Sequence, residues 1–314
     1  MAPPANAATY TGFQEATVYD GFQHFTLQAN ESNPQATTPP PAFVVSNTDG
    51  SSDFQVTQSG LNQPTSNPLG PAAYPSLYVG LHWPNDPTKG QPPTNPSAGD
   101  PFGQTGGPAY DGGLKWWLQV GAMAQGNPDI ETSFDMSAST TVAAGSVYDS
   151  AFDIWFNSSA DGNQVSGTTP SWSTTAIPGT SMEMMIWLNS HGMTPAGYNS
   201  SLPNDGAIAT NVSIESTTYN VFYQAHNSHS RTITFVATTP TTSLYSLALS
   251  PFANEVVALN GVKVNGSTDL TIANSWYLYD VEAGFEIYTG GGPSTGHTVG
   301  LSGEMHFNEC PGGC

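Results

Sequence analysis

The sequence predicts an all-β protein, with two antiparallel sheets packed as a sandwich of the jelly-roll kind and one short helix. The chain has 314 residues, among them 33 glycines and 26 prolines, which is typical of many short strands joined by turns. Only 9% of the residues are charged, well below the roughly 25% of an average globular domain. The 37% of hydrophobic residues are enough to fill the space between two sheets.

Alternation of apolar and polar residues predicts strands along most of the chain. The predicted strands cover residues 22–29, 43–46, 53–58, 74–83, 114–123, 130–137, 147–156, 182–188, 208–215, 218–225, 231–237, 276–288 and 297–307. The single predicted helix spans about 251–259, with Ser250 as N-cap, Pro251 in the first turn and Gly261 at the C-terminal stop. Phe252, Val256 and Leu259 then share its buried stripe.

The sequence predicts one large domain with a short segment at each end. Residues 1–20 read as a weakly structured lead-in, 21–308 as one domain and 309–314 as a tail. A Pro/Gly-rich loop over 84–113 is long enough to suggest a functional role. The two cysteines, Cys310 and Cys314, lie in the terminal CPGGC and cannot staple the domain.

The charge balance narrows the class of partner. Four Lys and Arg residues face 24 Asp and Glu residues, so the net charge is −20, which excludes an electrostatic footprint for nucleic acid and disfavours an anionic membrane. No run of about 18 apolar residues is present. An uncharged polysaccharide fits this surface better. The acidity itself has two readings, solubility or adaptation to acidic surroundings.

Three predicted strands each place acids beside aromatic side chains on the face that does not enter the core. In 182–188, Met182, Met184, Ile186 and Leu188 form the core face, and the other face carries Glu183, Met185 and Trp187. In 276–288 the second face carries Trp276, Leu278, Asp280, Glu282, Gly284, Glu286 and Tyr288. In 152–156 it carries Asp153 and Trp155.

Acids and aromatic rings on one surface match the chemistry of sugars, which have apolar faces and hydroxyl edges. Hydrolysis of a glycosidic bond needs two carboxyl groups, and a third acid near the nucleophile can share a proton with it. The same pattern also arises on an ordinary exposed sheet face with cross-strand pairs. A non-catalytic carbohydrate-binding sandwich and an inert structural β-protein therefore remain alternatives at this point.

Four segments, taken in order, resemble glycoside hydrolase family 12. They are YPSLYVGLHW (74–83), FDIWF (152–156), MEMMIWL (182–188) and WYLYDVEAGFEIYTGGG (276–292). The resemblance implies a jelly roll with a concave substrate cleft. It also implies a secreted, endo-acting, retaining β-1,4-glucanase that cleaves cellulose or a related β-glucan, with xyloglucan as the alternative substrate.

The resemblance also implies roles for single residues. Glu183 corresponds to the nucleophile, Glu286 to the acid/base and Asp153 to the aspartate that supports the nucleophile. The residues expected to bind substrate are Met185, Trp187, Trp155, His82, Trp83, Tyr288 and Asn30. Neither a metal nor a cofactor is implied, and the expected state is a monomer whose partner is the glucan alone. The expected location is extracellular, with a signal peptide absent from this chain.

The sequence departs from the family pattern at three places. Asn30-Glu31-Ser32 stands where relatives often carry Asn-x-Trp, which removes a ring that would stack on a sugar. Leu81 replaces a frequent disulfide cysteine, and Ile287 follows the acid/base where proline is common. These changes affect sugar subsites and stability more than the two predicted catalytic glutamates.

Overall fold

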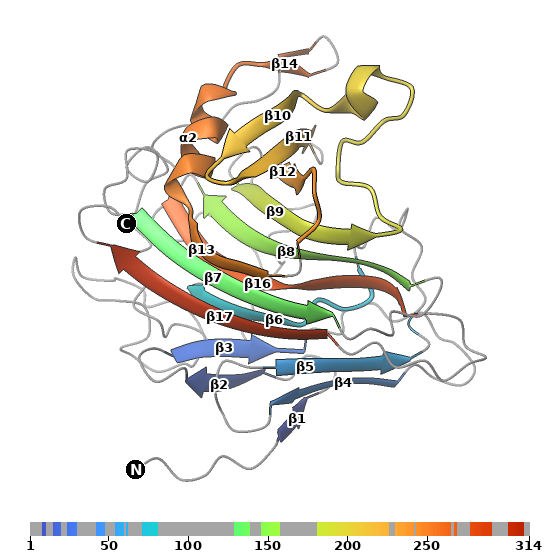
Figure 1. The fold of residues 1–314 in the computed structure, drawn as a ribbon, viewed down its shortest axis with the longest axis vertical. Coiled ribbons are helices and arrows are strands. Elements are labelled where there is room, and N and C mark those ends of the chain that lie inside the picture. The colour runs from blue at the N-terminus through green and yellow to red at the C-terminus, as the bar shows by residue number, and fades with distance from the viewer. Residues whose placement is uncertain are drawn as a thin grey trace.

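The computed structural model confirms a mostly β architecture of two large sheets and a single α-helix among the described residues (Figure 1). The structure describes residues 8–10, 15–19, 24–29, 42–47, 54–59, 61, 71–80, 129–138, 146–157, 181–225, 230–241, 243–264, 267–268, 277–290 and 301–310. Alternating sequences form strands because one face of each sheet is buried and the other is not. Of the helices in these ranges, none has the length and apolar content needed to cross a bilayer.

The smaller sheet has six strands in the order β1-β4-β5-β17-β7-β13, and all of its neighbours are antiparallel. Its strands are β1 (Ala8–Tyr10), β4 (Ala42–Asn47), β5 (Phe54–Ser59), β7 (Asp129–Ala138), β13 (Ser243–Ala248) and β17 (Leu301–Cys310).

The larger sheet has nine strands in the order β10-β11-β12-β9-β8-β16-β6-β3-β2. They are β2 (Glu15–Tyr19), β3 (His24–Gln28), β6 (Ser76–Gly80), β8 (Ser146–Asn157), β9 (Ser181–His191), β10 (Ala209–Ile214), β11 (Thr217–Ala225), β12 (Ser230–Ala237) and β16 (Tyr277–Gly290). Its neighbours are antiparallel except β12 and β9, which run parallel. A two-stranded ribbon of β14 (Lys263–Val264) and β15 (Ser267–Thr268) completes the set.

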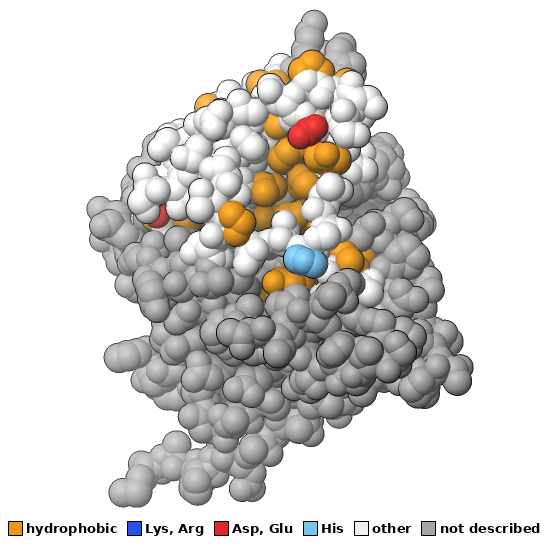
Figure 2. Space-filling model, turned by 45° about the vertical axis from the view of Figure 1, so that its right-hand side comes forward, with side chains coloured by type: hydrophobic (Ala, Val, Ile, Leu, Met, Phe, Trp, Pro, Cys, Tyr) orange, Lys and Arg blue, Asp and Glu red, His pale blue; other side chains and the backbone are white. Residues whose placement is uncertain are grey.

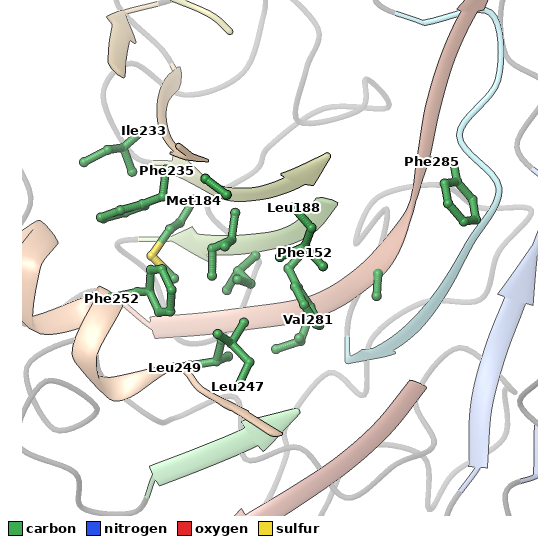
Figure 3. Packing of buried hydrophobic residues seen from close by; sticks show 14 of the residues in the cluster. Phe152, Met184, Leu188, Ile233, Phe235, Leu247, Leu249, Phe252, Val281 and Phe285 are labelled. Atoms are coloured by element: carbon green, nitrogen blue, oxygen red, sulfur yellow. The ribbon is translucent and has the colours of Figure 1, made fainter. Parts of the chain in front are cut away.

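The main hydrophobic core lies on the inner face of the nine-stranded sheet, and α2 (Ser250–Ala258) packs against it. Phe252 of α2 lies beneath Met184 and Phe235, with Leu247 and Leu249 close by (Figure 3). The rings of Phe252 and Phe235 meet edge to face with centroids 5.1 Å apart. The core faces predicted for 152–156 and 182–188 are confirmed, because their alternate side chains are all buried in this cluster. For the predicted strand 276–288 the same holds over 281–287, where the structure describes the side chains.

The helix is confirmed with one correction at its start. Phe252, Val256 and Leu259 are buried as predicted, and Gly261 has the positive φ of 86° that suits a stop. The N-cap prediction is wrong, because the helix begins at Ser250 and the N-cap position is Leu249, where no side chain caps the helix. Leu249 is fully buried, so core packing takes precedence over a polar cap here.

Paired strands extend beyond both ends of the predicted domain, 21–308. β1 pairs with β4 and β2 pairs with β3, so the first 20 residues contribute to both sheets. β17 extends to Cys310. The domain boundaries stay predictions, and the strand predicted at 114–123 and the loop predicted at 84–113 lie outside the described residues.

Candidate active site

Among the side chains that the structure describes, five carboxyl groups lie on the outer face of the nine-stranded sheet, and we call it the acidic face. They are Asp149 and Asp153 on β8, Glu183 on β9, and Glu282 and Glu286 on β16. All five occupy the positions that alternate with core residues, so the same pattern that buries one side of each strand presents the acids on the other. β8 lies between β9 and β16, and the three central strands curve together (Figure 1).

Glu183 lies opposite Trp155 of β8 on one side and Thr232 of β12 on the other. The hydroxyl of Thr232 donates a hydrogen bond of 2.6 Å to Oε2 of Glu183. Glu183 is partly exposed, whereas Thr232 is only 2% exposed. A buried donor of this kind orients the carboxylate and favours its charged form. Trp155 is half-buried and packs against the main core.

Glu286 lies directly opposite Asp149 across the β16–β8 ladder. Burial raises the pKa of Glu286, while a hydrogen bond from the Asp149 carboxyl group partly offsets this rise. Asp149 has no exposed surface, and its pKa is raised well above its ordinary value, first by burial and then by the charge of Glu286. The pair therefore holds protons to higher pH than isolated carboxyl groups do.

A second pair of opposed acids lies further along the same two strands, where Asp153 faces Glu282. Glu282 is fully buried and accepts hydrogen bonds at Oε2 from Gln28 Nε2 at 3.0 Å and from Ser76 Oγ at 2.9 Å. Gln28 also donates to Ser76 at 2.7 Å, which ties β3, β6 and β16 together beneath the acids. Asp153 is 5% exposed.

Small residues separate the two acid pairs. Ala151 of β8 faces Gly284 of β16, and Trp187 of β9 lies beside Ala151. Ala151, Met185 and Trp187 form a second hydrophobic cluster, distinct from the main core. Trp187 is 3% exposed, and its indole N–H has no acceptor among the described residues. An apolar ring and an available donor thus lie next to the acids.

Glu183 and Glu286 occupy different rows of the sheet, but their charges act on the same neighbouring groups. In a flat sheet their opposite positions on β8, Trp155 and Asp149, are six positions apart and would be separated by about 20 Å. The sheet is curved, however, and the negative charges of both glutamates help to raise the pKa values of Asp149 and Tyr288. Burial is the largest cause of both shifts.

The structure thus brings together most of the predicted site residues that it describes. Glu183, Glu286, Asp153, Met185 and Trp187 share the acidic face. Tyr288 is almost buried, two residues beyond Glu286 on the same strand. The roles of these residues stay predictions, and His82, Trp83 and Asn30 lie outside the described residues.

Four residues that the motifs did not single out belong to the site. Asp149 follows the same alternation as Asp153, so strand register alone could have identified it. Glu282 was predicted to lie on the acid-bearing face but was given no role. The residues that donate hydrogen bonds to it, on β3 and β6, are far from it in the sequence. Thr232 gave no local signal, and Tyr74 lay in the segment 74–83 without a predicted role. The pKa of Tyr74 is raised first by burial and then by the charges of four of these acids, which places its hydroxyl among them.

Comparisons with known proteins agree with this geometry. A sequence profile described as glycosyl hydrolase family 12 matches residues 128–302, more than half of the chain. No curated protein matches significantly in sequence. The matched segment contains β8, β9 and β16, the strands that carry the five acids, and also β12, which carries Thr232.

Solved structures of family members share the fold. A thermostable cellulase derived from the Rhodothermus marinus enzyme matches with a TM-score of 0.60 and 23% identity, over 97% of this chain and 100% of that one. A metagenome-derived family 12 endoglucanase matches with a TM-score of 0.62, 21% identity and coverage of 96% and 97%. A family 12 xyloglucanase from Bacillus licheniformis matches with a TM-score of 0.59, 18% identity and coverage of 98% and 99%. This protein belongs to glycosyl hydrolase family 12.

Proposed function

We propose that the protein is a secreted, endo-acting glycoside hydrolase that cleaves β-1,4 bonds of cellulose or a related β-glucan with retention of anomeric configuration. The observation that carries this proposal is that two glutamates, on the two strands that flank β8, have different surroundings. Glu183 accepts a hydrogen bond, which favours its charged form, and desolvation raises the pKa of Glu286, so that Glu286 keeps a proton to higher pH. Two carboxyl groups with opposite protonation are what glycoside hydrolysis requires.

The proposed reaction proceeds in two steps. Glu286 donates its proton to the glycosidic oxygen while the carboxylate of Glu183 attacks the anomeric carbon, which releases one half of the chain and forms a glycosyl-enzyme. Glu286, now ionised, then removes a proton from water, and the water oxygen displaces Glu183. This mechanism predicts about 5–5.5 Å between the two carboxyl groups in the substrate complex.

The surroundings of the acids suit an uncharged sugar chain. Trp187 and Met185 form an uncharged, apolar layer beside the acids, which suits a neutral ligand better than an anionic one. The described part of the face drawn in Figure 2 shows hydrophobic side chains among uncharged polar atoms, with acidic and histidine side chains near them. The net charge of −20 would repel an anionic polysaccharide.

Two variants test the roles of the glutamates separately. Glu183→Gln should abolish the release of reducing ends from β-glucan and leave binding intact. Glu286→Gln should retain turnover of an aryl cellobioside, whose good leaving group needs no protonation, and azide should accelerate that turnover by replacing the water step. A sugar azide of unchanged configuration from the Glu286 variant supports retention. An active Glu183→Gln enzyme overturns the assignment.

Substrate choice is tested with the same purified protein. Carboxymethyl cellulose, barley mixed-linkage glucan and xyloglucan are compared, because cellulases and a xyloglucanase all share this fold. A rapid fall in viscosity with few new reducing ends indicates endo-action. Binding to all three glucans without any release of reducing ends would favour the rival reading, a non-catalytic carbohydrate-binding sandwich.

A further inference from the structure

Asp149 is a fully buried acid that lies directly opposite Glu286 in the sheet. The two residues face each other in an antiparallel ladder, where opposite Cβ atoms are about 4.5–5.5 Å apart. Among the described residues, no group donates a hydrogen bond to either carboxylate oxygen of Asp149. The charge of Glu286 is, after burial, the largest cause of the raised pKa of Asp149, which fits two carboxyl groups that face each other. A buried ionised carboxylate without donors is costly, so a proton between the two groups satisfies both.

The groups around the pair are also acidic or neutral. Asp153 follows Asp149 on β8, and the charge of Glu183 on β9 acts on Asp149. On β16, Glu286 and Tyr288 are near Asp149. The hydroxyl of Tyr74, from the segment that precedes β6, lies in the same field. Arg231 and His191 belong to the opposite face, since Arg231 is on the core side of β12, in the same alternation as Ile233 and Phe235, and His191 stacks on Tyr148 of the core. In the described part of this face, therefore, no cation offsets the acids.

Two facing carboxyl groups titrate as a unit rather than singly. The first proton leaves readily because the remaining proton is shared in a strong, charge-assisted hydrogen bond. The second leaves with difficulty because two adjacent negative charges result. While only one proton is present it is held between both groups, and its transfer to a substrate would leave two facing charges.

We propose that Asp149 is a positioning residue that shares a proton with Glu286, so that Glu286 works as an acid only while the pair carries two protons. This rests on the role of Glu286 proposed above. Asp149 thereby holds the Glu286 side chain against β8 and confines its acid function to lower pH than burial alone would give. The deeper burial of Asp149 makes it the partner that keeps its proton longer.

The pH dependence of kcat/KM for β-glucan hydrolysis tests this arrangement. In Asp149→Asn an amide replaces the carboxyl group with nearly the same shape, and its neutral N–H donates a weaker hydrogen bond to Glu286. The pKa of Glu286 should rise, and the alkaline limb of the profile should move up by roughly one pH unit. An alkaline limb that stays in place or moves down would overturn the proposal.

A titration that needs no activity separates this proposal from the proposed function. In protein labelled with carbon-13 at the glutamate side-chain carboxyl, the Glu286 signal should shift in two steps, and in Asp149→Asn in one step at higher pH. Asp153→Asn is the matched control, since it removes another buried acid of β8 and should leave both steps in place. A single step in the unaltered protein refutes proton sharing. Two steps in a protein that cleaves no glucan leave sharing intact and refute the hydrolase.

Discussion

At the scale of single residues, the hydroxyl of Thr232 has the most specific relation to a predicted catalytic group. It is buried on β12 and donates to Oε2 of Glu183, while the next hydroxyl on the same face of that strand, Thr234, is buried with no partner among the described residues. Replacing either threonine with the isosteric valine removes a hydroxyl group and keeps the shape of the side chain. Comparing the two variants therefore separates the effect of the hydrogen bond from the effect of packing.

Thr232→Val should lower kcat/KM on β-glucan by roughly ten- to a hundredfold. Its physical basis is the hydrogen bond to a charged acceptor, which contributes about 1.5–3 kcal/mol. Steady-state kinetics measure the loss. The matched change Thr234→Val removes an unsatisfied hydroxyl and should leave kcat/KM within a factor of about two and stability equal or higher. Equal losses in both variants would show that the Thr232 bond has no special role.

At the scale of elements, β16 and the segment before β6 meet at unusually short range. An added Cβ at Gly284 would lie 2.4 Å from the carbonyl oxygen of Pro75 and 2.6 Å from Cβ of Ser76. The amide of Phe285 donates to that same Pro75 oxygen at 3.1 Å, so the backbone cannot move away without losing a bond. Gly284 thus lets β6 approach the row between the two acid pairs.

Gly284→Ala should destabilise the fold by about 1–3 kcal/mol through overpacking and should also reduce activity by displacing Ser76 from Glu282. Chemical denaturation and kinetics on one preparation measure the two effects. Gly261→Ala is the comparison, because nothing lies within 4 Å of its added Cβ and only the positive φ opposes it. That variant should lose about 1 kcal/mol of stability and no activity. A fully stable Gly284→Ala protein would contradict the packing argument.

The elements also show why the sequence predicted some features and not others. Alternation in 152–156, 182–188 and 276–288 gave the strand type and the buried face, because period two is a local property. Partners are not local. The parallel pairing of β12 with β9 brings Thr232 to Glu183 across 49 positions, and the bonds of Glu282 reach back to Gln28 across 254. Short edge elements such as β14 are held by pairing rather than by propensity, and the alternation did not predict them.

At the scale of the whole molecule, buried acids and a large negative charge act in the same direction. Asp149 and Glu286 have raised pKa values in the folded chain, so the native state binds more protons than the unfolded state between their ordinary and raised values. Stability from these groups is therefore complete below about pH 4 and is lost as pH rises through the raised values. The net charge of −20 adds repulsion over the same range.

The melting temperature should accordingly be higher at pH 5 than at pH 8, as followed by circular dichroism. Asp149→Asn should flatten this dependence, since it removes one of the buried groups that takes up the proton. Salt distinguishes the two causes, because it screens exposed charges more than buried ones. If 0.5 M salt abolishes the pH dependence, the effect comes from exposed surface charges and not from the buried acids. A melting temperature that rises towards pH 8 would refute both the buried-acid and the surface-charge contribution.

The parallel pairing of β9 with β12 makes the orientation of Glu183 depend on a strand that comes later in the chain. Between β9 and β12 the chain forms β10 and β11. β10 pairs with β11, β11 pairs with β12, and only then can β12 pair in parallel with β9. A polypeptide truncated ahead of Ser230 would still contain Glu183, but on a bare strand edge that invites aggregation. During synthesis, the nucleophile candidate therefore acquires its oriented form only once some fifty later residues have emerged.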